Sequence, residues 1–218
     1  MRSTTRVFAV GLLGVCLASC QSLQYKAWEQ LGVEKRDLLL DNVEDARDAQ
    51  TDAKSDFASA LDAFRSAVDF DGGDLGTAYE EMNRAYERSA SSAEKVSSRI
   101  ADIETVAEDL FDEWEDEIGQ YQDARLKQRS QTLLSDTQDR YADLINAMRQ
   151  AEQTAEPVLN TFRDRVLFLK HNLNARAISS LRGDLQKIET DTSKLIAEMN
   201  AAIDSANSFI ENLNAEKT

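Results

Sequence analysis

The stretch that decides the fold is residues 75–114, LGTAYEEMNRAYERSASSAEKVSSRIADIETVAEDLFDEW. Its mostly apolar or small stripe residues recur alternately every four and every three positions. They are Leu75, Tyr79, Met82, Tyr86, Ser89, Ala93, Val96, Ile100, Ile103, Ala107, Leu110 and Trp114. This is the a/d heptad pattern of a helix that buries one narrow stripe against other helices. We therefore expect one helix about 60 Å long, packed lengthwise against its neighbours.

Three further segments carry stripes of the same spacing. The first consists of Leu39, Val43, Ala46, Gln50, Ala53, Phe57, Ala60, Phe64 and Ala67. The third consists of Leu134, Thr137, Tyr141, Leu144, Met148, Ala151, Ala155, Val158, Phe162, Arg165 and Leu169. The fourth runs through Ile178, Leu181, Leu185, Ile188, Thr192, Leu195, Met199, Ala202, Ala206, Phe209 and Leu213. The third stripe continues past Pro157, which indicates a kink near Thr154 and not the end of a helix.

Two segments between the stripes predict reversals of the chain. In residues 69–75, Gly72 and Gly73 permit positive φ angles, and Asp74 is a favourable N-cap for the next helix. Residues 119–130 are polar and separate the second stripe from the third. We expect a turn in each segment.

A third reversal is predicted in residues 170–177. Leu169 and Ile178 lie nine residues apart, which no heptad repeat accommodates, and Asn172 and Asn174 suit the end or the start of a helix. The fold class is therefore all-α: an elongated, antiparallel, coiled-coil-like bundle of four long helices over residues 36–218. The alternative is three helices, of which the last is continuous and kinked.

The N-terminus has the features of a bacterial lipoprotein signal. Residues 1–19 contain Arg2 and Arg6, no acid, and an apolar run of about ten residues that is too short to span a bilayer. The run ends in Leu17-Ala18-Ser19-Cys20, which resembles a lipobox. We expect residues 1–19 to be removed, Cys20 to carry acyl chains that hold the protein at the membrane, and residues 20–35 to form a tether.

The residue after the expected lipidation site indicates which membrane holds the protein. By resemblance to Gram-negative lipoproteins, an Asp there would favour retention in the inner membrane, and the chain has Gln21. The sequence therefore predicts an outer-membrane lipoprotein that faces the periplasm.

Net charge limits the classes of partner. The chain has a formal charge of −15, and removal of residues 1–19 leaves 23 basic and 40 acidic residues, a charge of −17. Nucleic acids and anionic membrane surfaces attract basic proteins, so neither is an expected partner. Cys16 leaves with the signal and Cys20 is lipidated, so no disulfide is expected and the domain depends on packing alone.

An acidic cluster closes the decisive stretch. It consists of Glu108, Asp109, Asp112, Glu113, Glu115, Asp116 and Glu117. Like charges one helical turn apart repel, and acids oppose the dipole at the C-terminus of a helix. The simplest interpretation is a solvated face that a strong apolar stripe tolerates. The functional interpretation is a surface for a basic partner or for divalent cations.

No catalytic, metal or cofactor site is predicted. His171 is the sole histidine, and no second ligand or nucleophile accompanies it in a recognisable pattern, so we expect a capping or exposed residue. Residues 69–75 lack the alternating ligands and the final glutamate of an EF-hand. The sequence therefore predicts a protein that is not an enzyme and has no cofactor.

Three stretches resemble a known family. They are residues 68–75 (VDFDGGDL), 110–117 (LFDEWEDE) and 167–178 (LFLKHNLNARAI). Together they resemble DUF2959, a family of proteobacterial lipoproteins without an established function. The resemblance implies a lipoprotein and brings no activity, cofactor or catalytic residue.

These features favour a structural or adaptor protein of the cell envelope, anchored through Cys20 and binding another envelope protein. The alternative is a membrane-shaping coiled coil similar to BAR domains, or a self-assembling scaffold. The net charge of −17 after residue 19 opposes the BAR-like interpretation, because BAR domains present basic faces to membranes. A narrow apolar stripe also favours association with a second copy, and a homo-oligomer is the further expectation.

Overall fold

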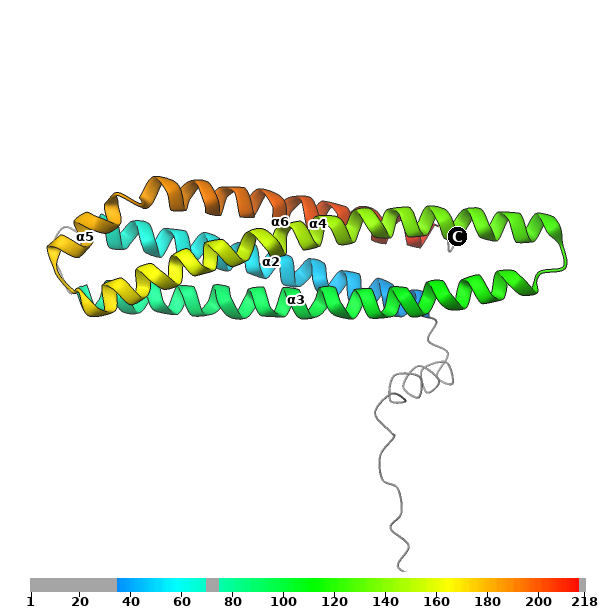
Figure 1. Ribbon diagram of the computed structural model, residues 1–218, viewed down its shortest axis with the longest axis horizontal. Helices are drawn as coiled ribbons and strands as arrows, with labels where there is room; N and C mark the ends of the chain where they lie inside the picture. Colours follow the sequence, from blue (N-terminus) through cyan, green and yellow to red (C-terminus); the bar gives the residue numbers. More distant parts are fainter. Residues whose placement is uncertain (1–34, 70–74, 216–218) are drawn as a thin grey trace, which may run out of the picture. The chain divides into compact units, whose positions relative to one another are not determined.

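The computed structural model describes residues 35–69 and 75–215, and within these ranges it contains helices and no strand. The helices are α2 (Lys35–Val68), α3 (Leu75–Gln120), α4 (Ala124–His171), α5 (Ala175–Arg182) and α6 (Leu185–Ala215), shown in Figure 1. The predicted all-α fold with four long helices is confirmed, and α5 is a short addition to it.

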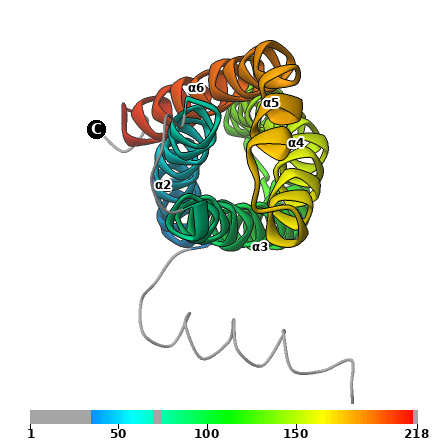
Figure 2. The same ribbon diagram turned by 90° about the vertical axis from the view of Figure 1, so that its left-hand side faces the viewer.

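The four long helices form an antiparallel bundle that is square in cross-section (Figure 2). α2 packs on α3 and α6, and α4 packs on the same two helices. The short helix α5 links α4 to α6 at one end of the bundle, where it contacts α2 and α4. Each long helix therefore covers its apolar stripe with two neighbours.

The predicted stripes form the core. Every predicted member in α2 is buried, including the polar Gln50. In α4 only Tyr141 and Arg165 of the predicted members are less than fully buried. The largest buried side chains include four phenylalanines, and the rings of Phe64 and Phe162 meet edge to face at 6.5 Å between centroids. Burial of such a side chain stabilises a fold by roughly 1.5–3 kcal/mol.

The two predicted reversals that lie within the described residues are both present. Asp123 caps the N-terminus of α4, since its Oδ1 accepts hydrogen bonds from the backbone N–H groups of Arg125 and Leu126 at 2.8 and 3.2 Å. In the next reversal, Asn172 is the C-cap of α4 and Asn174 the N-cap of α5. The turn at Asn172–Asn174 decides between the two sequence interpretations in favour of separate helices. The first predicted reversal centres on residues 70–74, outside the described residues.

The fourth stripe divides between two helices, which the sequence did not predict. Ile178 and Leu181 are buried in α5, whereas α6 begins only at Leu185. Between them the backbone N–H groups of Gly183 and Asp184 donate to the carbonyls of Ser180 and Leu181, in bonds that span only three residues. This tight turn interrupts the helix while keeping the apolar residues on the core side.

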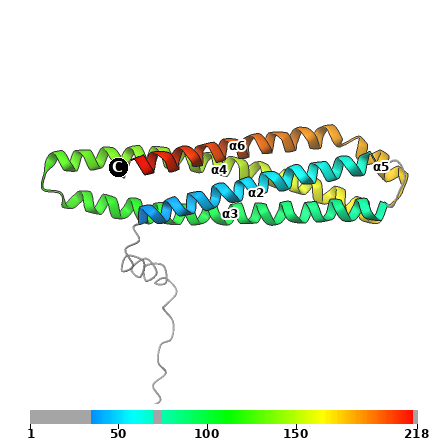
Figure 3. The same ribbon diagram turned by 180° about the vertical axis from the view of Figure 1, so that it is seen from behind.

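The bundle has unequal ends. The ammonium of Lys35, the first residue of α2, lies 2.8 Å from the Glu113 carboxylate of α3. Near the C-terminus of α6, the Leu213 carbonyl accepts a hydrogen bond from Arg36 at 3.5 Å. α3 and α4 continue beyond this level to their own turn (Figures 1 and 3). We call residues 114–139, which form this two-helix extension, the arm.

The core assignment predicts a large and position-specific effect of a buried charge. Ile100 is fully buried, so we expect Ile100→Asp to lower the free energy of unfolding by about 4 kcal/mol or more, through lost packing and an unpaired carboxylate. Ser98→Asp, on the exposed side of the same helix, should change it by less than about 0.5 kcal/mol. Urea denaturation followed by circular dichroism measures both, and equal stability of the two variants would contradict the assignment.

Candidate functional site at the α3–α4 arm

The apolar stripes of α3 and α4 continue onto the arm, beyond the helices that cover them elsewhere. Ile118 lies 18 residues, five helical turns, after the core residue Ile100, and Leu126 lies 18 residues before the core residue Leu144. Both therefore project from the core-facing side of their helix. Ile118 is 6% exposed, whereas Leu126 is 53% exposed. The apolar side chains of the arm therefore stay covered at Ile118 and Leu134, and toward the tip Leu126 faces solvent.

The base of the arm is also only partly covered. Leu110 and Trp114 belong to the predicted stripe but are only half-buried. Trp114 turns its indole toward α4, where Nε1 donates a hydrogen bond to the Ser130 hydroxyl at 2.9 Å. One turn away, the rings of Phe111 and Tyr141 meet edge to face with centroids 5.3 Å apart. These contacts hold α3 and α4 together at the base of the arm.

The acidic cluster lies on the other side of α3. Five of its members are exposed and two, Asp109 and Glu113, are half-buried. Glu113 pairs with Lys35, and Glu115 accepts a hydrogen bond from Gln138 of α4 at 3.5 Å. In the described part of the chain, no group of three or more His, Cys, Asp or Glu residues could hold a metal ion. The structure thus brings the cluster together as a broad outward-facing surface of α3.

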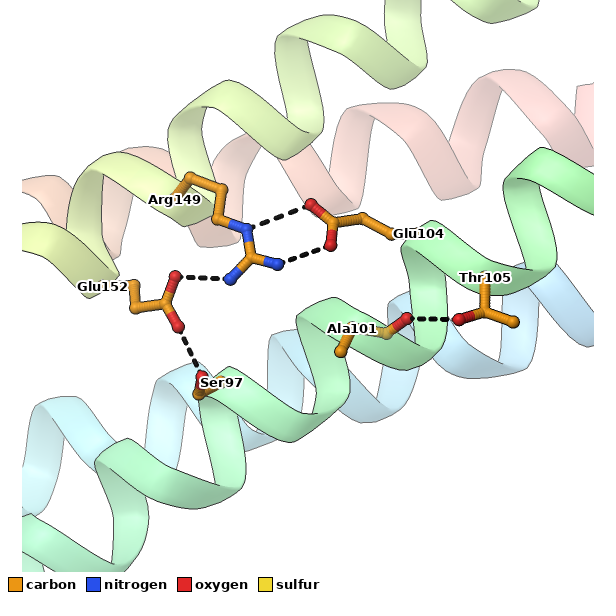
Figure 4. Close-up of polar contacts among 6 residues, drawn as sticks. All are labelled: Ser97, Ala101, Glu104, Thr105, Arg149 and Glu152. Carbon is orange, nitrogen blue, oxygen red and sulfur yellow. Dashed lines mark hydrogen bonds and ion pairs between the residues drawn. The ribbon is translucent and has the colours of Figure 1, made fainter.

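Below the arm, an arginine joins α3 to α4 (Figure 4). The Arg149 guanidinium donates two hydrogen bonds to the Glu104 carboxylate, from Nε at 3.0 Å and from Nη2. Nη1 donates to Glu152 at 2.6 Å, and Glu152 also accepts from the Ser97 hydroxyl at 2.5 Å. The fork of an arginine matches a carboxylate in this paired geometry, which fixes the register of the two helices.

The same contacts alter the protonation of their members. Hydrogen bonding to Glu104 raises the pKa of Arg149 above its ordinary value, against the effect of burial. Burial acts to raise the pKa of Glu152, but hydrogen bonds from Ser97 and Arg149 outweigh it and lower the pKa. Burial and the negative charges of Glu104 and Glu108 raise the pKa of Tyr141 to about 12. Tyr141 is therefore a neutral phenol near pH 7.

Sequence reasoning missed this arginine contact, although a signal for it exists. Glu104 and Arg149 each follow a stripe residue directly, Ile103 and Met148, and so flank the buried stripes of their helices. His171, singled out as a lone histidine, is exposed at the last residue of α4. Cys20 lies outside the described residues.

None of the helices in the described ranges is long and apolar enough to cross a membrane. This finding leaves the predicted lipid anchor at Cys20 as a separate expectation.

Comparison with known families gives one match. The model of a family described as "Protein of unknown function (DUF2959)" matches residues 24–213. The chain belongs to this family. The match covers α2, α3, α4 and α5 entirely and nearly all of α6, so the bundle and the arm are both within the DUF2959 region. No curated protein and no solved structure matches the chain.

The Arg149 contacts predict a change in both stability and its pH dependence. We expect Arg149→Met to lower the free energy of unfolding by about 1 kcal/mol, because the ion pairs are partly exposed. The folded state lowers the pKa of Glu152, so its contribution is present above the ordinary value of 4.5 and is lost as the pH falls below it. The variant should therefore lose less stability than the wild type on acidification.

Urea denaturation between neutral pH and about pH 3 measures this difference. Arg163→Met is the matched control, because Arg163 is exposed and its guanidinium lies 3.9 Å from Asp164, outside hydrogen-bond range. An acid response of Arg149→Met that is as steep as that of the wild type and of the control would contradict the assigned role.

Proposed function

We propose that this DUF2959 protein is a non-enzymatic adaptor of the cell envelope. In this proposal Cys20 carries the acyl chains that anchor the protein in the outer membrane, and the bundle faces the periplasm. The arm binds a second envelope protein. The observation that carries the proposal is the arm itself: a two-helix extension with the exposed Leu126 near its tip and a dense acidic surface on α3.

The chemistry of the arm defines the kind of partner. Amphipathic helices bind by laying an apolar face on an apolar groove, with side chains at helical spacing as anchors. The exposed Leu126 and the half-buried Trp114 offer such apolar surface, and the same segment of α3 carries the exposed carboxylates of Asp116 and Glu117. A basic, amphipathic helical segment complements both features. The opposite charges would also speed its association with the arm.

The N-terminal sequence supports the anchoring part of the proposal. The family match begins at residue 24, four residues after Cys20, so the expected signal peptide lies outside the DUF2959 region. A single acyl chain holds a protein at a membrane only marginally, whereas the several chains of a lipidated cysteine hold it firmly. Such an anchor restricts the arm to partners within reach of the membrane.

The adaptor proposal predicts one predominant crosslinked partner that depends on the anchor. Crosslinking in whole cells, followed by purification from the envelope, should recover one envelope protein with the wild-type chain and lose it with Cys20→Ala. Abundant self-crosslinks without another protein would contradict the adaptor and favour the self-assembling scaffold.

A second prediction locates the contact on the arm. Reversing two exposed arm charges, Asp116→Lys with Glu117→Lys, should reduce recovery of the partner about tenfold or more, because each reversal places like charges across the interface. The matched control reverses two exposed acids of α3 far from the arm, Glu81→Lys with Glu87→Lys. If the two variants recover the partner equally, the arm is not the contact surface.

A further inference from the structure

A cleft opens between α3 and α4, on the side of the Arg149 contacts away from the arm. It has a volume of about 560 Å³, within the range of small-molecule sites. Ser97 and Glu152, which take part in the Arg149 contacts, line it, and Gln50 of α2 reaches it from the core. The cleft thus combines a buried polar side chain with an opening to solvent.

Gln50 is the polar group that distinguishes this cleft. The residue is 0% exposed, yet neither its amide nitrogen nor its amide oxygen has a hydrogen-bond partner within the described structure. Of the other buried polar residues, Ser89 and Thr137 donate to a carbonyl one turn earlier in their own helix, whereas the Thr192 hydroxyl of α6 has no partner in the described residues. A buried amide without partners disfavours folding, so its presence in an apolar stripe calls for a reason other than stability.

The walls of the cleft are apolar and small. Tyr86 and Ala93 belong to the predicted stripe of α3 but are only half-buried, because they border the cleft where a closely packed neighbour would otherwise cover them. Across from them, Ala155 and Leu159 of α4 line the cleft. The alanines leave open the space that larger stripe residues would fill.

Pro157 of α4 lies within this stretch and has no backbone N–H. The carbonyl of Gln153, one turn earlier and also in the cleft lining, therefore lacks its usual helical donor. The cleft lining thus includes a residue whose backbone acceptor is not used by the helix.

The charge of the cleft is negative. Glu94, Glu152 and Glu156 line it, and among the described lining residues there is no Lys, Arg or His. Glu152 already accepts hydrogen bonds from Arg149 and Ser97. Glu94 and Glu156 are exposed at the rim and free to attract a cation.

We propose that this cleft binds a small organic ammonium compound whose apolar linker carries an amide or a hydroxyl group at its far end. Because the Gln50 amide is closed to solvent in this structure, its side chain would turn toward the cleft to pair with the amide or hydroxyl. Only a group that both donates and accepts satisfies both atoms of a carboxamide. The linker would lie along Ala93, Ala155 and Leu159. The ammonium would meet the carboxylates of Glu94 and Glu156. This inference is independent of the proposed adaptor function.

The test uses 6-aminohexanamide, which joins a primary amine to a carboxamide through five methylene groups, as the probe for the full chain. Titration followed by NMR should give saturable shifts, including those of the Gln50 side-chain amide. Hexanamide, which lacks the ammonium, and hexylamine, which lacks the amide, should each bind about tenfold more weakly. Absence of saturable shifts with all three compounds up to about 10 mM would overturn the proposal.

Variants separate binding by Gln50 from simple attraction to an acidic surface. Gln50→Leu should weaken 6-aminohexanamide about tenfold and raise the melting temperature by several degrees, since it removes an unpaired buried amide. Glu94→Gln with Glu156→Gln should weaken binding of the probe and reduce its salt dependence, whereas Glu117→Gln, on the arm and far from the cleft, should not. Unchanged affinity in Gln50→Leu would overturn the proposal.

Two further measurements keep the test decisive. If Gln50→Leu lowers the melting temperature, the amide has a structural role in the folded chain, and the proposal is overturned. Ala93 is half-buried, so Ala93→Met fills the cleft while leaving the buried Gln50 in place. This variant should abolish binding of the probe. Full affinity in Ala93→Met would place the probe elsewhere.

Discussion

The structure depends on one constraint: a long helix with a single apolar stripe can bury that stripe only against other helices. The described residues contain no cysteine and hence no disulfide that could replace this packing. Four helices solve the problem by surrounding one core, each in contact with two neighbours. The alternation of four and three residues sets which side chains enter the core, and therefore which way every polar residue faces.

The constraint explains why the two sites lie where they do. α2 and α6 have 34 and 31 residues, whereas α3 and α4 have 46 and 48. The surplus of α3 and α4 at one end becomes the arm, with its apolar stripe partly bare. In the middle of the bundle, alanines on α3 and α4 replace the bulky residues that would close the interface, and the cleft opens there. Both sites are therefore positions where an apolar stripe continues without full cover.

The sequence predicted the fold well because heptad spacing is a local signal that tertiary contacts reinforce. It predicted less well which stripe residues would be fully covered. Tyr86, Ala93, Leu110 and Trp114 have the right spacing yet remain half-buried. Burial at these positions depends on the length of the neighbouring helix and on the volume of its side chains. The spacing of residues within one helix gives no information about either. α5 was missed for a similar reason, since its tight turn keeps the apolar residues in phase.

For the candidate sites too, sequence reasoning found the features that are local in the chain and missed those that depend on contacts between helices. The acidic cluster was evident from composition, because its seven members fall within ten residues. The contact of Arg149 with Glu104 joins residues 45 positions apart, so only the register of α3 against α4 reveals it. Gln50 was recognised as the polar member of its stripe, but its lack of partners becomes visible only when the facing side chains are known.

The position of Lys35 has a mechanical consequence. α2 begins at the base of the arm, where the Lys35 ammonium meets Glu113, and not at the end of the bundle closed by α5. A pulling force applied between the start of α2 and the tip of the arm would enter α3 within one turn of this ion pair. It would bypass the aromatic core around Phe64 and Phe162. The bundle would then transmit tension through a short segment of α3 while most of its length stays unloaded.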